Sequence, residues 1–410
     1  MRQLFRSSPR TTVESRSSGL RDAVVVVVVV VLATMMVLLP TGGVAQEDAR
    51  RDSIEVQKAR NQHVQSRGKK AFYSRKFDLS DLPSYKPEQK ITGTIRIWGL
   101  NYLGDANLAN YWDRGFRSYQ PDAKIEWHLP VAMASTSALV TGVADIGANR
   151  GLTFTEILQF ERVFNYSPLE LDMVTGSFDV PGWANAIGIF VNKANPSSKL
   201  TLKQLDGIFG AARTGGWFGT SWNPQVARGP EENVRTWGQL GLTGEWADKP
   251  IHVYGLNLRY DTATKFSDKV LKGSDKWNEN LIMYANYAKP DGSLAIGAAL
   301  LMKDLSNDPY GIAYSGIQNL TPETKAIALA VNDGGPYVEM SMDSVWKRTW
   351  PLYQRETWVL NRKPGQALDS KVKEFMRYVF SREGQQEVVR DGKFLPLTGE
   401  LVREQLKKLD

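Results

Sequence analysis

Residues 350–365 read WPLYQRETWVLNRKPG, residues 368–389 read LDSKVKEFMRYVFSREGQQEVV, and residues 391–397 read DGKFLPL. The first run predicts a strand that stops at a Pro-Gly turn, because its apolar, aromatic and β-branched residues end where the chain can reverse. The second run predicts one helix followed by another that opens at Ser381, and the third predicts a short return. This order of elements is the most informative feature of the chain.

Upstream of this run, strand patterns alternate with helix patterns. Such alternation is typical of an α/β protein with parallel strands. The predicted strands are 91–99, 123–129, 144–148, 186–192, 251–255, 310–314 and 327–331, and the predicted helices are 106–119, 135–142, 155–164, 200–209 and 262–271. Residues 210–247 are rich in Gly, Trp and Arg with weak helical periodicity, so we expect a surface loop there with at most one helix.

Length and composition restrict the classes of protein to consider. A chain of 410 residues exceeds one typical domain, which favours two domains, and its 42% hydrophobic residues suffice for sizeable cores. The sequence has no cysteine. Disulfides, thiolate metal sites, a cysteine nucleophile and lipid attachment to an N-terminal cysteine are therefore excluded.

The N-terminus has the pattern of an export signal. Arginines precede the apolar run Ala23–Leu39, and small residues follow at 43–45. This pattern predicts a signal peptide, residues 1–45, that is cut before Gln46. An uncleaved anchor is the alternative, because the apolar run is close to the shortest that spans a bilayer core of about 30 Å. Either version places the rest of the chain outside the cytoplasm, and we expect the periplasm.

Charge is modest in the part that follows. Loss of residues 1–45 removes five arginines and two acids, which lowers the formal net charge from +7 to +4. That surplus is compatible with attracting small anions and does not predict nucleic-acid binding. Residues 46–90 are charged and poor in apolar residues, so we expect a linker with a short surface helix over 53–65.

Four stretches of the body resemble one family. They are 145–153 (DIGANRGLT), 200–210 (LTLKQLDGIFG) with 236–241 (TWGQLG), 309–314 (PYGIAY), and the C-terminal runs quoted above. In this order they resemble the phosphate-type periplasmic substrate-binding proteins of ABC transporters, of the type II periplasmic-binding-protein superfamily. The resemblance covers about residues 91–400.

The resemblance implies a fold and a function. The fold is an α/β protein of two lobes, with mixed sheets flanked by helices and a ligand cleft between the lobes. Lobe one would be 91–182 plus 355–410 and lobe two 183–354, with crossings near 183–192 and 350–360. The implied function is capture of a small oxyanion, phosphate or similar, for an ABC importer. The implied partner is a membrane permease, and we expect a monomer without a cofactor, metal, catalytic activity or nucleic-acid partner.

A tetrahedral oxyanion is best bound by backbone N–H groups at helix N-termini, hydroxyls and an arginine. Four strand-to-helix junctions could supply them. The first, Gly99 to Asp105, offers Asn101 and Tyr102, although its leucines would also suit a tight packed turn. The second offers Ser135 and Thr136, either of which could instead simply cap the helix.

The third junction offers Asn149 and Arg150. Asn149 falls where the family has serine, and Arg150 falls where the phosphate-specific members have an aspartate that accepts a hydrogen bond from the protonated ligand. Arginine has no acceptor atom. Arg150 is therefore a candidate anion ligand or a partner in an ion pair, either on the surface or between the lobes. Thr153 and Glu156 just beyond it have the spacing of a capping box.

The fourth junction offers Arg259 and Thr262. Thr262 falls on the family's threonine, but Leu256 occupies the position of its arginine, which Arg259 could replace. Asp261 would repel an anion or cap the following helix. The resemblance is thus stronger for the scaffold than for phosphate, since the second, third and fourth junctions depart from the family's pattern.

Three alternatives stay open. An organic solute could bind to apolar side chains at the same junctions: Tyr102, Leu103, Met133, Leu256 and Tyr260. A secreted phosphatase finds little support, because His63, His128 and His252 are scattered and form no metal-ligand spacing. A cell-envelope interaction protein could use 46–90 and 210–247 as contact surfaces.

Overall fold

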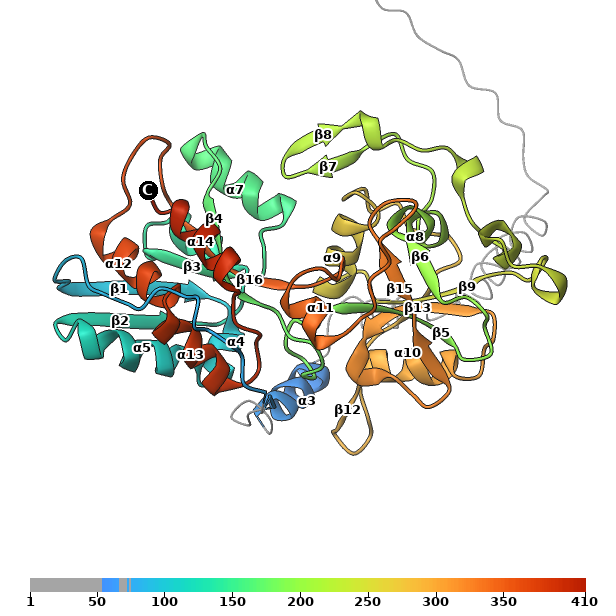
Figure 1. Cartoon of the computed structure of the whole chain (residues 1–410), viewed down its shortest axis with the longest axis horizontal. Coiled ribbons are helices and arrows are strands. Elements are labelled where there is room, and N and C mark those ends of the chain that lie inside the picture. The colour runs from blue at the N-terminus through green and yellow to red at the C-terminus, as the bar shows by residue number, and fades with distance from the viewer. Residues whose placement is uncertain (1–53, 66–71, 74) are drawn as a thin grey trace, which may run out of the picture. The chain divides into compact units, whose positions relative to one another are not determined.

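The computed structural model describes residues 54–65, 72–73 and 75–410 (Figure 1). The predicted signal peptide and its cleavage site lie outside these residues. The contacts discussed below all lie within one compact unit, Lys58–Asp410. The structure describes only one segment of the preceding unit, namely the start of helix α3 (Ile54–Gln65). Helix α3 coincides with the predicted surface helix.

The first sheet has the strand order β2-β1-β3-β16-β4. Its strands are β1 (Gly93–Gly99), β2 (Ala123–His128), β3 (Ile146–Asn149), β4 (Leu169–Thr175) and β16 (Arg355–Leu360). β1 runs parallel to β2 and β3, whereas β16 runs antiparallel to both β3 and β4. The strand predicted from the C-terminal run is therefore inserted between strands from the N-terminal part of the chain, and the sheet is mixed.

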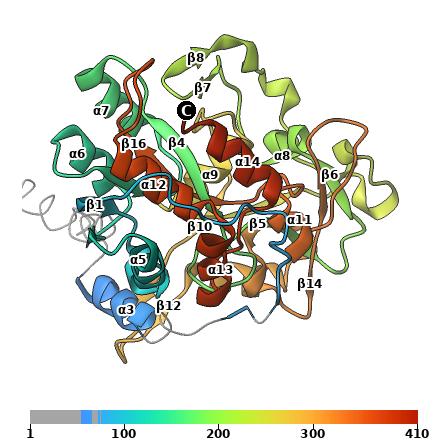
Figure 2. The same cartoon turned by 60° about the vertical axis from the view of Figure 1, so that its left-hand side comes forward.

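Seven helices accompany this sheet in the described part of the chain. They are α4 (Asn101–Asp105), α5 (Leu108–Tyr119), α6 (Ala134–Val140), α7 (Phe154–Phe164), α12 (Ser370–Val379), α13 (Arg382–Asp391) and α14 (Gly399–Lys407). Helices α12 and α13 pack beside α5 although they are far from it in sequence (Figures 1 and 2). The predicted opening of α13 is confirmed, because Ser381 is its N-cap and accepts a hydrogen bond from the Gly384 N–H.

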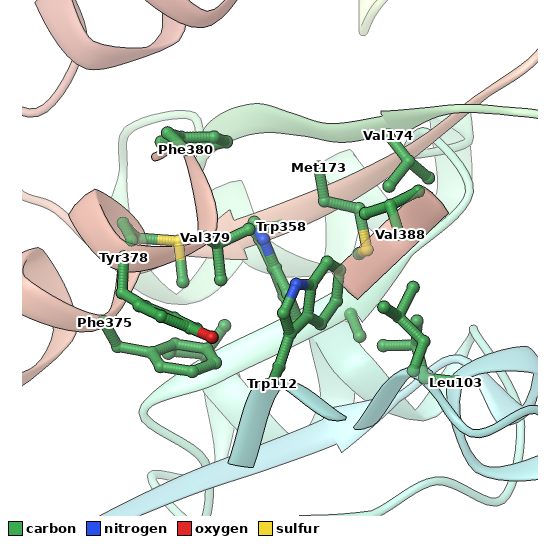
Figure 3. Close-up of a cluster of buried hydrophobic side chains, with 14 of the residues drawn as sticks. Leu103, Trp112, Met173, Val174, Trp358, Phe375, Tyr378, Val379, Phe380 and Val388 are labelled. Atoms are coloured by element: carbon green, nitrogen blue, oxygen red, sulfur yellow. The ribbon is translucent and has the colours of Figure 1, made fainter. Parts of the chain in front are cut away.

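The first core forms where α5 meets the C-terminal helices. Leu108, Trp112 and Phe116 are four residues apart, so they share one helix face, and all three are buried. Trp112 lies with its ring centroid 5.5 Å from that of Trp358 in β16, and Phe116 lies 5.3 Å from Phe375 in α12 (Figure 3 shows three of these rings). The indole N–H of Trp112 donates to a carbonyl of α13. The core thus connects α5 with the C-terminal strand β16 and helices α12 and α13.

The second sheet repeats this plan with the order β10-β9-β13-β5-β14. Its strands are β5 (Ile187–Asn192), β9 (His252–Leu256), β10 (Ile282–Tyr284), β13 (Gly311–Gly316) and β14 (Thr324–Ala326), and its helices are α8 (Leu202–Phe209), α9 (Asp261–Lys269), α10 (Gly297–Leu305) and α11 (Met342–Trp346). β13 runs parallel to β9 and antiparallel to β5. A separate core fills this part, in which Phe266 stacks on Tyr314 at 4.5 Å. Two mixed sheets, each with its own core and helices, confirm the predicted fold class.

The segment 210–247 contains no α-helix, as expected, but it is more ordered than a plain loop. It holds a two-stranded ribbon and four 3-10 turns: β7 (Gly216–Phe218), β8 (Ser221–Asn223), η1 (Pro224–Val226), η2 (Pro230–Glu232), η3 (Trp237–Leu240) and η4 (Gly244–Trp246). Buried Arg213 and Arg228 both pair with Asp206 of α8, at 2.6 and 3.4 Å. These ion pairs attach the segment to the second core.

Minor elements complete the chain. They are β6 (Lys199–Thr201) paired with β15 (Ala328–Ala330), β11 (Tyr287–Ala288) paired with β12 (Leu294–Ala295), and η5 (Ile317–Asn319). Among the described residues, no helix combines the length and the apolar character that crossing a bilayer requires.

Several elements differ from the expectations. Part of the predicted linker is packed, because Leu79, Leu82 and Tyr85 are buried in the first core. β4, α10 and α14 fall outside the predicted elements. In β4 the carboxylates Glu170 and Asp172 interrupt the apolar pattern, and the fold pairs both with arginines.

Candidate functional site

The end of β3 is tied to two helices by one amide. The Asn149 Nδ2 group lies 2.7 Å from the Ser135 Oγ atom and 2.8 Å from the Glu156 Oε1 atom. Its Oδ1 atom accepts from the Arg150 N–H at 2.6 Å. The hydrogen bonds of Asn149 therefore hold α6 and α7 against the end of the strand. The predicted capping box of Thr153 and Glu156 at the start of α7 is confirmed.

Ser135 and Thr136 are helical residues, and the interpretation of either as an N-cap is wrong. The cap position of α6 belongs to Met133, whose side chain makes no capping hydrogen bond. Both hydroxyl residues are fully buried. The Thr136 Oγ1 atom has no hydrogen-bond partner among the described residues, which is costly for a buried polar group unless a further molecule supplies the partner.

Arg150 is the central cation of the site. Its Nη1 atom lies 3.7 Å from the Asp261 Oδ2 atom, and its guanidinium lies 5.8 Å from the centre of the Tyr102 ring. Burial by itself would lower the Arg150 pKa, but Asp261, Tyr102 and Glu356 outweigh it and raise the pKa above its ordinary value. The guanidinium therefore stays charged at any physiological pH, while its Nε atom is buried without a partner among the described residues.

Glu356 is a buried carboxyl beside this arginine. It is the second residue of β16, is fully buried, and neither of its carboxyl oxygens has a hydrogen-bond partner in the described chain. Burial raises the Glu356 pKa well above its ordinary value, and Asp261 adds to this, whereas Arg150 and Lys265 oppose it. The carboxyl is therefore the acidic group of the site that most readily holds a proton.

Helix α9 of the second sheet approaches the loop after β3. The Lys265 Nζ atom donates to the Gly151 carbonyl at 3.0 Å, and the Gly151 N–H donates to the Thr357 Oγ1 atom at 3.2 Å. Gly151 has a φ of +86°, and a Cβ atom there would lie 3.0 Å from the Lys265 Nζ atom. Glycine thus permits both the left-handed turn and the close approach of the lysine.

Further cations gather behind this loop. Arg348 and Arg355 both pair with the Asp172 carboxylate. Burial by itself would raise the Asp172 pKa, but the two arginines outweigh it and lower the pKa. Burial, together with the neighbouring cations Arg355, Lys265 and Arg348, lowers the pKa of Lys269 to about 7. Arg348 and Arg355 are thus partly neutralised by Asp172 and Glu170, and Lys269 is only partly charged near neutral pH.

The remaining predicted residues are more dispersed. Asn101 donates to the Asp105 carboxylate at 2.8 Å, and the Tyr102 ring lies tilted against that of Trp183 with 5.7 Å between the centroids. Arg259 is exposed and contacts Asn257, with 3.4 Å between its Nε atom and the Asn257 Oδ1 atom. Thr262 is the second residue of α9 and is partly buried.

The structure therefore groups the predicted residues unequally. It brings Tyr102 and Arg150 together, and it places Ser135 and Asn149 behind them as supports. Asp261, proposed as a repelling charge or a cap, is the first helical residue of α9, and the cap position belongs to Tyr260. Asp261 serves instead as the ion-pair partner of Arg150.

Glu356 and Lys265 are absent from the predicted site. The signal for Glu356 lies in the quoted run itself, where an acid stands inside a strand that is otherwise buried. Lys265 had no such signal, because a lysine on a helix is ordinarily a solvated residue and only its contact with Gly151 reveals it.

The apolar junction residues do not form a pocket together. Leu103 is buried in the first core and Leu256 in the second, while Met133 is 63% exposed. The Tyr260 hydroxyl accepts a hydrogen bond from the Asn286 N–H at 2.7 Å. These positions give no common apolar surface for an organic solute.

His128 and His252 are each in contact with a neighbouring side chain. His128 stacks on Trp98 with 4.6 Å between ring centroids, and the His252 Nδ1 atom lies 2.8 Å from an Asp308 carboxylate oxygen. The described residues contain no group of three or more His, Cys, Asp or Glu that could hold a metal ion.

Comparison with known proteins identifies the family. The sequence matches the model of the PBP superfamily domain over residues 87–383. It is 30% identical over 329 residues to the phosphate-binding protein PstS of Pseudomonas aeruginosa strain PAO1, which covers 80% of this chain and 90% of that protein.

Similar solved structures include PstS from Borrelia burgdorferi (TM-score 0.49, 14% identity, 76% of this chain and 100% of that chain). An ABC-type phosphate transport receptor from Vibrio cholerae is also similar (TM-score 0.45, 17% identity, 74% of this chain and 100% of that chain). The family match and the relative of 30% identity each extend over most of the sequence. The chain therefore belongs to the PBP superfamily, among the phosphate-type periplasmic substrate-binding proteins that its sequence resembles.

Proposed function

We propose that this protein is an extracytoplasmic solute-binding protein that captures a small oxyanion, phosphate first of all, for an ABC importer. Arg150 is the observation that carries the proposal: a charged guanidinium at the end of β3 with a buried Nε atom that lacks a partner in the described chain. A guanidinium offers planar, paired donors that match the oxygens of a tetrahedral anion. The name of the Pseudomonas relative, a phosphate-binding protein, supports phosphate as the first ligand to test.

The proposed ligand contacts are Tyr102, Thr136, Arg150 and Thr262. The unpartnered Thr136 hydroxyl supports its inclusion. We assign Ser135 and Asn149 a supporting role, because their polar atoms already bind each other. Asn101 and Arg259 stay predictions as ligand contacts.

The proposal includes closure of two lobes on the ligand. Lobe one would be 91–182 plus 355–410 and lobe two 183–354, and the strands of the two sheets fall within these limits. The partners would be the anion and the membrane permease of the importer. The protein would act in the periplasm as a monomer, without catalysis or a nucleic-acid partner.

Isothermal titration of the purified protein with phosphate, sulfate, molybdate and tungstate tests this function. Arg150→Met should lower phosphate affinity about ten- to a hundredfold, because a hydrogen bond to a charged group usually contributes a free energy of that size to binding. Arg114→Met is the matched control, since Arg114 is exposed on α5. Absence of heat with all four anions at millimolar concentration would remove the anion proposal.

The absence of catalysis has its own test. Incubation of the protein with p-nitrophenyl phosphate should release no p-nitrophenol above the rate of a buffer blank. Release that disappears on replacement of one Ser or Thr would instead establish a phosphatase.

A further inference from the structure

The ribbon formed by β7 and β8 contacts helix α7, which belongs to the other sheet (Figure 1). The Trp217 ring lies against the Phe154 ring, with 4.6 Å between the two centroids. The Thr220 hydroxyl donates to the Glu161 carboxylate, with 2.8 Å between Oγ1 and Oε2. Phe154 and Glu161 are separated by about two helical turns, so they lie on one face of α7. The ribbon therefore contacts α7 along a single face.

The shape of the ribbon directs these two side chains to α7. Gly219 and Thr220 form the turn between β7 and β8, so Thr220 stands at the tip. Gly219 has a φ of +58°, which glycine adopts without strain. Trp217 pairs across the ribbon with Trp222, whereas the next residue, Phe218, points to the opposite face and is 83% exposed. One face of the ribbon thus meets α7 while the Phe218 side chain stays in solvent.

The two partners of this contact are attached to different sheets. Just before β7, the buried Arg213 guanidinium donates to both oxygens of the Asp206 carboxylate in α8, at 2.6 and 2.7 Å. A paired contact of this kind fixes orientation as well as position, so the ribbon is anchored to the second sheet. Helix α7 is attached to the first sheet, because its Phe160 belongs to a buried cluster with Val359 of β16.

Helix α7 is also connected to the candidate anion site. Its Glu156 carboxylate accepts from the Asn149 amide at 2.8 Å, and the Asn149 Oδ1 atom accepts from the Arg150 N–H at 2.6 Å. A displacement of α7 therefore displaces the junction that carries Arg150. Elements of the second sheet contact this stretch at four residues, of which the first two meet α9 and the last two meet the ribbon: Arg150, Gly151, Phe154 and Glu161.

We propose that the ribbon is a latch on the anion site, with Trp217 and Thr220 as positioning residues that act through α7 on the junction of Arg150. The inference rests on the proposed function, because a latch requires two parts that open and close. The ribbon meets α7 when the parts close on the anion and leaves it before the anion departs. The contact therefore stabilises only the closed arrangement, which raises affinity and delays release of the anion.

Stopped-flow measurement of phosphate release and titration calorimetry with inorganic phosphate test the latch. Trp217→Ala should weaken phosphate binding by about fivefold to tenfold, which is the usual contribution of an aromatic pair. Thr220→Val keeps the shape of the side chain but lacks the hydroxyl, so binding should weaken by about threefold to tenfold. Both losses should appear as faster dissociation with an unchanged association rate. Thr220→Ser supplies the hydroxyl again and should restore slow release.

Phe218→Ala is the matched control, because it removes an aromatic ring from the exposed face of the same ribbon. It should bind and release phosphate like the unaltered protein. Unchanged dissociation rates in both Trp217→Ala and Thr220→Val overturn the inference. Melting temperatures separate a latch from a permanent structural contact: Thr220→Val should melt like the unaltered protein without phosphate and earlier with it. A lower melting temperature of this variant without phosphate overturns the inference as well.

The opening of the latch can be measured directly. The sequence has no cysteine, so spin labels on the double variant Phe218→Cys with Arg162→Cys attach only at these two exposed positions, one on the ribbon and one on α7. Phosphate should shorten the distance between the labels. A single short distance without phosphate overturns the latch. Failure of phosphate to bind the unaltered protein would instead refute the proposed function, and the label distance would still decide whether the ribbon separates from α7.

Discussion

Asp261→Asn is the most direct perturbation of the electrostatics at Arg150. The Asp261 carboxylate lies 3.7 Å from the guanidinium, and the two side chains are 29% and 26% exposed. An anion in contact with the same guanidinium would lie roughly 6 Å from the carboxylate, where two unit charges repel by about 0.7 kcal/mol at a dielectric constant of 80 and about 3 kcal/mol at 20. Partial exposure favours the lower half of this range. We therefore expect phosphate affinity to rise about fivefold to tenfold in the variant.

Stability should change in the opposite direction. Asp261 is in the first turn of α9, where a carboxylate interacts favourably with the helix dipole, typically by about 0.3–1 kcal/mol. Urea unfolding should therefore show a small loss of stability together with the gain in affinity. Such a pair of results cannot come from general damage to the fold.

Isothermal titration with phosphate at low and at physiological ionic strength is the assay. The gain should be larger at low salt, because screening weakens the repulsion that the substitution removes. Asp333→Asn serves as the control, because Asp333 lies on an exposed loop of the region that contains the second sheet. This variant should leave the affinity unchanged. Unchanged or weaker binding of Asp261→Asn at both salt concentrations would refute the reasoning and show that Asp261 orients Arg150 for the ligand.

Two further predictions concern stability. Trp112→Ala removes a fully buried ring and the indole hydrogen bond to the Gly384 carbonyl (2.8 Å), so urea unfolding should show a loss of about 3–5 kcal/mol; a loss below 1 kcal/mol would mean that this core is not continuous. The pKa of Lys269 is lowered to about 7 in the folded protein. Above that pH the unfolded chain therefore binds more protons than the folded one. The stability of the folded protein consequently rises with pH from about 7 towards 10. Melting temperatures of the unaltered protein, relative to Lys269→Met, should therefore rise between pH 6 and pH 9, and a constant difference would contradict the assigned pKa shift.

The sequence indicated one junction of the candidate site but not the contacts that its residues make. The junction at Asn149 and Arg150 is recognisable because a short buried strand ends there in polar residues. The partner of Arg150 was left open between a ligand and an ion pair, since Asp261 is more than a hundred residues away in the chain and only the approach of α9 brings it within 3.7 Å. The support of Asn149 by Ser135 and Glu156 is likewise a product of packing between α6, α7 and β3.

The sequence by itself determined the alternation of strands and helices and the capping of α7 and α13. These features depend on local periodicity, cap residues and turn residues, which act over a few positions of the chain. Tertiary structure alone decided that Leu79 and Tyr85 are core residues, that β4 can carry acids inside a sheet, and that Glu356 is buried without a partner. Burial, charge pairing and desolvation depend on which distant residues meet in space, and the order of residues along the chain does not state that.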